Sequence, residues 1–245
     1  MAEHMQLRSS NPILQSNAFK GNLISKTDGE MTMEGTTNKA GLLLLITTVC
    51  AYYTWNQPQL IGWLIPLLIA GLLTAIVTAL KPQWSPISAP LYAVVQGGLL
   101  GILSTVFEQQ YPGIAVQAIA LTFCIFAAML MAYRTGLIKA TQKFKLGVAA
   151  ATGGIMLLYL LSLVLRFFGI TLGFLYDNSL LSIGFSLFVV VIAALNLVMD
   201  FDFIEEGCEH GCPKFMEWFA AFSLLVTLIW LYIEVLRLLA KIRSR

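Results

Sequence analysis

Residues 180–199 form a run of twenty residues without a single charged side chain. At a rise of about 1.5 Å per residue, an α-helix of this length spans about 30 Å, the thickness of the hydrocarbon core of a bilayer. The composition agrees, because 58% of the 245 residues are hydrophobic and only 11% are charged. A soluble domain carries about 25% charged residues. The chain is therefore predicted to be a polytopic membrane protein.

Six further apolar stretches predict six further membrane helices, separated by short polar or proline-containing breaks. Helices are expected because lipid cannot satisfy exposed backbone groups and no strand-like alternation is present. The seven predicted spans are residues 40–55, 60–80, 89–107, 114–133, 146–168, 180–199 and 215–239. The expected fold is an all-α membrane protein with seven transmembrane helices, the last of them central in the bundle. Residues 1–39 are predicted to be a polar, partly disordered N-terminal segment that precedes the transmembrane domain of residues 40–245.

The distribution of basic residues predicts the orientation, since Lys and Arg favour the cytoplasmic side. One group precedes the first span and another follows the fourth: Arg8, Lys20, Lys26 and Lys39, then Arg134, Lys139, Lys143 and Lys145. Both groups are cytoplasmic if the N-terminus is inside. Arg166 and the basic C-terminal tail oppose this orientation, so either the tail is an exception or one span does not cross fully.

Carboxylates gather directly after the sixth span. Of the thirteen acids in the chain, six fall within eighteen residues: Asp200, Asp202, Glu205, Glu206, Glu209 and Glu217. A carboxylate at the end of a membrane span is costly and therefore marks a functional site. Ser182, Ser186, Asn196 and Asp200 also recur on one side of the sixth helix. This stripe predicts a water-filled path, with polar packing between helices as the alternative.

Two acids of the last span could meet Asp200. If the sixth helix runs on to Gly207 and the seventh begins at Pro213, a hairpin brings Glu217 to a similar depth. Glu234 lies seventeen residues further along, and Arg237 at i+3 can neutralise it. The expected depth in the membrane therefore favours Glu217 as the acid that meets Asp200. Two carboxylates held together cannot both ionise easily, so the pair is expected to titrate as a unit.

Other chemistry is weakly indicated. Cys208, His210 and Cys212 have a spacing that could suit zinc, but no second Cys/His cluster accompanies them, so reduced thiols in a loop are expected. No phosphate loop, nucleophile elbow or zinc-protease motif is present. The chain is expected not to be an enzyme, to need no cofactor and to bind no nucleic acid.

Three segments carry a resemblance to a known family. They are DFDFIEEG from Asp200, PKFMEW from Pro213 and WLYIEVLRLL from Trp230. Together with seven spans they resemble the Bax inhibitor family. MTMEGTTNK from Met31 is similar to a segment of its bacterial YccA-like branch. The resemblance covers residues 31–241 and implies a bacterial inner membrane protein.

The resemblance implies a calcium-leak channel sensitive to pH, with a carboxylate pair from the last two spans as its sensor. Asp200 matches the first member of this pair. For the second member, the family-like sequence LYIE points to Glu234, whereas the depth in the membrane favours Glu217. An alignment continued from Asp200 without a gap places it near Leu225, where there is no acid. Asp200 and Glu217 are the predicted calcium ligands.

Asn196, Ser186 and Asp202 are the candidate residues of the ion path. The alternative function implied by the family is a non-conducting partner that modulates a membrane protease or a stress pathway. The expected partners are therefore the bilayer, calcium, protons and, under that alternative, another membrane protein.

Overall fold

The structure is a computed structural model that describes residues 29–55 and 57–245. Predictions made for residues 1–28 lie outside the described residues. The elements follow in the order α1 (Met33–Thr54), η1 (Pro58–Trp63), α2 (Leu64–Leu80), η2 (Pro82–Trp84), α3 (Ser85–Gln110), α4 (Ile114–Arg134), α5 (Gln142–Phe167), α6 (Gly173–Tyr176), α7 (Leu180–Glu209) and α8 (Met216–Arg243). The described chain is all-helical apart from one isolated bridge between Glu30 and Pro213.

Six segments of the described chain are long and apolar enough to cross a membrane. They are Pro58–Leu80, Pro82–Gln110, Ile114–Arg134, Gln142–Phe167, Leu180–Glu209 and Met216–Arg243. They coincide with the predicted spans from the second to the seventh, which they contain fully except for Phe168 and Phe215 at the edges of two spans. The helices extend beyond the apolar runs, because a helix continues through polar residues until a cap or a break ends it.

The first helix, α1, has 22 residues and is long enough to cross a membrane, but it is not among these segments. Its N-terminal turns contain the polar residues Glu34, Asn38 and Lys39, which make it less apolar than the other six. It begins at Met33, seven residues before the predicted span. Thr32 provides the cap, since its side chain accepts a hydrogen bond from the Gly35 N–H at 3.0 Å. Part of the segment predicted to be polar and partly disordered is thus helical.

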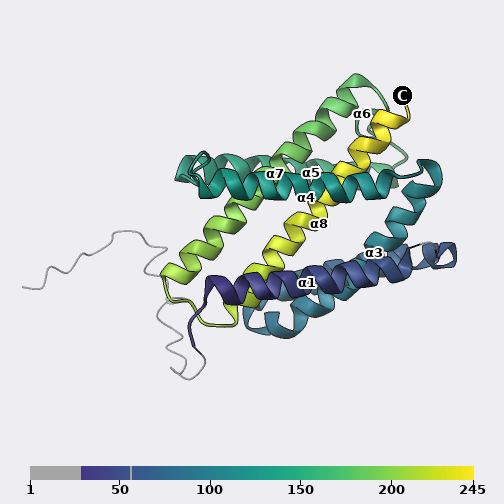
Figure 1. Cartoon of the computed structure of the whole chain (residues 1–245). Helices are drawn as coiled ribbons and strands as arrows, with labels where there is room; N and C mark the ends of the chain where they lie inside the picture. Colours follow the sequence, from purple (N-terminus) through teal and green to yellow (C-terminus); the bar gives the residue numbers. More distant parts are fainter. Residues whose placement is uncertain (1–28, 56) are drawn as a thin grey trace, which may run out of the picture.

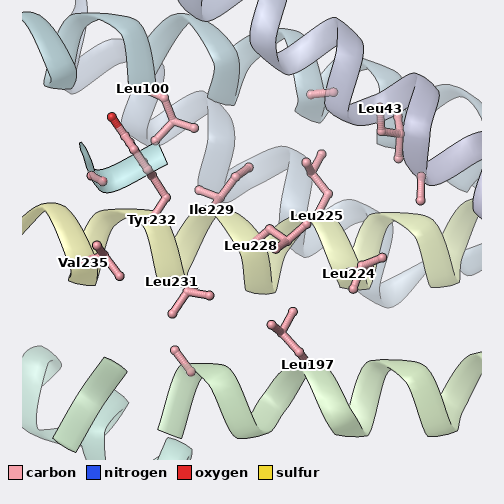
Figure 2. Packing of buried hydrophobic residues seen from close by; sticks show 14 of the residues in the cluster. Leu43, Leu100, Leu197, Leu224, Leu225, Leu228, Ile229, Leu231, Tyr232 and Val235 are labelled. Atoms are coloured by element: carbon pink, nitrogen blue, oxygen red, sulfur yellow. The ribbon is translucent and has the colours of Figure 1, made fainter. Parts of the chain in front are cut away.

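Helix α8 lies in the middle of the bundle and packs against α1, α3, α4 and α7 (Figure 1). Its apolar residues point in several directions, because it has helices on several sides. Figure 2 shows Leu225 and Ile229 on the side of α8 that faces α1 and α3, and Leu231 on the side that faces Leu197 of α7. The expected central position of the last helix agrees with this packing.

Glycines allow α1 and α3 to approach closely. A Cβ on Gly97 would lie 2.5 Å from the Thr47 carbonyl oxygen, and a Cβ on Gly101 would collide with the Ala51 carbonyl oxygen. Small residues let backbones approach in this way in membrane helices. A second glycine group, Gly147, Gly153 and Gly154 on α5, faces open space, so only the first group serves a helix contact in the described chain.

The outward faces of the helices are apolar. On α2 and α5 many large side chains are exposed, for example Ile65, Leu72, Leu157 and Leu160. A soluble protein would expose these over a far smaller continuous area. The chain is therefore a multi-pass, all-helical membrane protein whose apolar outer faces contact lipid.

Candidate functional site

Asp200 lies in α7 on the face that packs against α8, and only 7% of it is exposed. The Ser223 hydroxyl of α8 donates a hydrogen bond of 2.6 Å to Oδ1. The other oxygen, Oδ2, is buried and has no hydrogen-bond partner among the described residues. No Lys or Arg of the described chain forms an ion pair with Asp200. The carboxylate is thus buried without a basic partner, and the hydroxyls of Ser223 and Thr227 of α8 are its polar neighbours.

Glu217 is buried in the first turn of α8, and the N-terminal end of α1 supplies its partners. The Thr32 N–H and hydroxyl donate to Oε1 at 3.0 and 2.9 Å. Lys39 forms an ion pair with Oε2. A Cβ on Gly35 would collide with this carboxylate, so glycine is required there for the helix to approach. Glu217 is therefore fully hydrogen-bonded and neutralised.

The predicted pairing of Asp200 with Glu217 does not occur in this state of the protein. Ser223, which hydrogen-bonds Asp200, lies six residues after Glu217, or about 9 Å along α8. Glu234 is eleven residues after Ser223, or about 16 Å along the helix in the other direction. Glu217 is thus closer than Glu234 to the depth of Asp200, as predicted from the hairpin of the last two spans. Each of the three acids nevertheless has partners of its own.

Glu234 is neutralised by the base that the sequence indicates. Arg237 Nη1 lies 3.0 Å from Oε1, in the i+3 ion pair that the sequence predicts. The Tyr159 hydroxyl of α5 donates to the same carboxylate at 3.1 Å, and the Arg237 guanidinium lies over the Tyr159 ring. This site joins α5 to α8 by charge and hydrogen bonds at the end of α8 opposite to Glu217.

The three candidate path residues have different environments. The Asn196 amide donates to Thr152 Oγ1 of α5 and to the Ile192 carbonyl, both at 2.8 Å. Ser186 Oγ accepts a hydrogen bond from Lys241 at 2.8 Å. Asp202 forms an ion pair with Lys145. Asn196 thus joins α7 to α5, whereas Ser186 and Asp200 lie on the buried face of α7.

Four of the partners just described were missed from the sequence. Lys39 and Thr32 lie in the family-like segment from Met31 and Lys241 in the basic tail, but the sequence predicts no contact between these residues, or Ser223, and a buried charge. A signal for Lys39 was present, because a base so close to an apolar span needs an acid or water. Ser223 carries no such signal, since hydroxyls are common on membrane helices, and Thr32 precedes α1 as its N-cap.

The loop cysteines lie beside the docked N-terminal segment. Met31, Ile204 and Ala220 form a small cluster against which Cys208 and Cys212 pack, and the Met31 N–H donates to the Cys212 carbonyl at 2.7 Å. Burial raises the pKa of the Cys212 thiol, which favours its protonated form. The described residues contain no group of three His, Cys, Asp or Glu side chains suited to a metal ion.

An apolar cavity of about 140 Å³ lies between α1, α3, α4 and α8. Leu225, Leu228 and Tyr232 of α8 contribute to its wall. The Tyr232 hydroxyl and Ser104 Oγ lie 2.7 Å apart at this wall and hydrogen-bond each other. Leu225, near which the family-like alignment expects an acid, thus lines an apolar space and cannot join Asp200 in binding an ion.

Comparison with known proteins supports the resemblance found in the sequence. A search of curated proteins and a search of solved structures gave no match to the chain. The model of the family described as Bax inhibitor 1 like matches residues 11–244, which is nearly the whole chain. This match includes all the described helices and every acid considered above. The chain belongs to the Bax inhibitor 1 like family.

Proposed function

We propose that this protein conducts cations across a membrane, with calcium as the conducted ion and Asp200 as the carboxylate that binds the ion. One observation carries the proposal. Asp200 is buried between α7 and α8 with an unpartnered oxygen and no basic partner in the described chain. Glu217 and Glu234, which are even more deeply buried, are each neutralised by a base. A carboxylate without a counter-ion in a membrane protein is expensive and is typical of an ion or proton site.

Calcium fits the chemistry of this site. Calcium binds oxygen ligands, above all carboxylates, and Asp200 has the Ser223 hydroxyl beside it. Because calcium needs the ionised carboxylate, protons compete with it. This competition is the basis on which we propose pH sensitivity. Glu217 could become a second ligand only after leaving Lys39 and Thr32, so we propose that separation of α1 from Glu217 accompanies opening.

The proposed topology has seven spans, with α1 crossing the membrane and the N-terminus in the cytoplasm. In support, α1 packs against both α3 and α8, and Leu45 and Val49 on its outer face are exposed as they are on the other lipid-facing helices. The similarity of the segment from Met31 to the YccA-like branch supports a bacterial inner membrane as the location.

Calcium flux tests the function directly. Purified protein in liposomes that contain a calcium indicator should admit calcium, and Asp200→Asn should reduce the flux at least about tenfold. Glu206→Gln is the matched control, because Glu206 is an exposed acid of the same helix. Equal flux through the wild type and Asp200→Asn would refute the assignment of Asp200.

The alternative function is a non-conducting partner of another membrane protein. Its support is the closed packing in this state, in which two of the three buried acids are neutralised and the cavity is apolar. Folded wild-type protein that admits no calcium at any pH between 5 and 8, the range in which carboxylate and histidine switches operate, would favour this alternative over conduction.

A further inference from the structure

The ammonium group of Lys241 is buried at the end of α8 opposite to Glu217. Only 6% of Lys241 is exposed, although α8 ends two residues later at Arg243. Lysines near the ends of membrane helices normally extend their charge into water. Arg243 is exposed, and it reaches the Pro112 carbonyl and Gln117 at the surface. Lys241 is directed into the bundle instead, so its ammonium has specific partners there.

Three neutral oxygens surround this ammonium. Lys241 Nζ donates to the Leu175 carbonyl and to Ser186 Oγ, both at 2.8 Å, and to the Ser182 carbonyl at 3.4 Å. An ammonium has three N–H donors, so each has one acceptor. None of the acceptors is a carboxylate. The nearest acid on α8, Glu234, is paired with Arg237. Among the described residues no Asp or Glu forms an ion pair with this ammonium, which is bound by neutral oxygens.

A fourth oxygen belongs to the same group of residues. The Ser182 side chain is fully buried, and its hydroxyl has no hydrogen-bond partner among the described residues. A buried hydroxyl left unpaired is costly. Backbone carbonyl oxygens coordinate alkali cations in membrane transporters, and two such carbonyls lie together here with two serine hydroxyls. Because these oxygens are neutral, they suit an ion with one positive charge better than an ion with two.

This site shares the α7 face that carries Asp200. Ser182 and Asp200 are eighteen residues apart, which is five helical turns and about 27 Å. Both are buried on the side toward α8. Asp200 thus lies near one end of this face and the Lys241 site at the other, beside α6 and the C-terminus (Figure 1).

We propose that Leu175, Ser182 and Ser186 form a site for a monovalent cation, which the protein fills with its own Lys241 ammonium. The Lys241 ammonium, which is covalently fixed to α8, closes the end of the ion path opposite to Asp200. The closing role rests on the proposed function, whereas the cation site does not. A conducted cation has to displace the ammonium, because two positive charges cannot share one set of neutral oxygens.

The cation site is tested by thermal stability, which can be measured whether or not the protein conducts ions. Lys241→Ala empties the site, and ethylammonium should then raise the thermal unfolding midpoint of this variant in detergent. Tetramethylammonium is the control, because it has the charge but no N–H donor. Sodium and potassium should also stabilise Lys241→Ala, whereas neither they nor ethylammonium should stabilise the wild type or Lys241→Arg to the same extent. Equal shifts in all three proteins would refute the site.

The closing role is tested by flux. Lys241→Met, which retains the length of the side chain, should raise cation flux in liposomes about tenfold, because the fixed charge is gone. Ser186→Ala removes one acceptor and should raise flux less, which provides a test that does not require a folded Lys241 variant. Flux unchanged in both, with a conducting wild type, would refute the closing role and leave the function standing. Wild-type protein that does not conduct would refute the function and the closing role, while the stability experiment would still decide the cation site.

Discussion

Lys39 of α1 and Glu217 of α8, which are 178 residues apart in the chain, form a buried ion pair that fastens the N-terminal helix to the end of the central helix. The two side chains differ in exposure, because 18% of the Lys39 side chain reaches solvent and only 1% of the Glu217 side chain does. Thr32 adds two hydrogen bonds to the same carboxylate. The polar contacts between the N-terminal end of α1 and the first turn of α8 thus meet at a single carboxylate.

The difference in exposure predicts unequal effects of removing each partner. Lys39→Met leaves a buried, unpaired carboxylate and should cost about 3 to 5 kcal/mol of unfolding free energy. Glu217→Gln leaves a lysine that can turn toward water, and the Gln carbonyl still accepts from Thr32, so about 1 to 2 kcal/mol is expected. Unfolding in detergent followed by tryptophan fluorescence measures both. A larger loss for Glu217→Gln would contradict the buried pair.

Gly35→Ala should displace the Glu217 carboxylate, because the added Cβ would collide with it. A loss of about 1 to 3 kcal/mol is expected from this overpacking. Gly41→Ala is the matched control on the same helix, since nothing lies within 4 Å of its added Cβ. Alanine is a better helix former, so this control should gain up to about 1 kcal/mol. Equal effects of the two variants on thermal stability would show that α1 does not approach Glu217 closely.

Calcium should stabilise the wild type against thermal unfolding, and this stabilisation should weaken as the pH falls. Protonation removes the negative charge that calcium needs, so the apparent affinity decreases with acid. Asp200→Asn should abolish both the stabilisation and its pH dependence. Glu234→Gln should leave both unchanged, because Glu234 is already engaged by Arg237 and Tyr159. If Glu234→Gln removes the pH dependence and Asp200→Asn retains it, Glu234 is the sensor.

The proposed orientation is tested by labelling. In a variant without the four native cysteines, a cysteine at the exposed position Lys139 should be protected from an impermeant thiol reagent applied outside the cell. A cysteine at Gln109, exposed at the end of α3, should be labelled from outside. Reversed labelling of the two positions would place the N-terminus outside and move the Asp200 end of the bundle with it.

The positions of the membrane helices could be predicted from the sequence because the relevant information is local. An apolar run of about twenty residues matches the bilayer by its length alone, whatever it packs against. The breaks at Pro58 and Pro82 and the cluster of acids after residue 199 were found for the same reason. The Glu234–Arg237 pair also followed from helical spacing within a single element.

The first helix shows where this local reasoning ends. Its apolar run predicted a start at residue 40, whereas α1 begins at Met33. The seven extra residues include Lys39, and they are held by Glu217 of α8. The composition of residues 33–39 is that of a polar segment, and the Thr32 cap together with the contact between Lys39 and the distant Glu217 explains why they are helical.

The sequence by itself determined that the protein is a bundle of membrane helices, where the apolar part of each helix lies and that Asp200 is a costly acid at the end of a span. The Glu234–Arg237 pair follows from helical spacing, but only the tertiary structure decided how Glu217, Asp200 and the buried lysine Lys241 are partnered. Lys39 reaches Glu217, Lys241 enters a group of neutral oxygens, and Asp200 is left with Ser223. These contacts depend on how each helix is rotated and tilted against its neighbours. Rotation and tilt are set by packing between residues far apart in the chain, such as Gly97 against Thr47. They cannot be predicted from the length and composition of an apolar run.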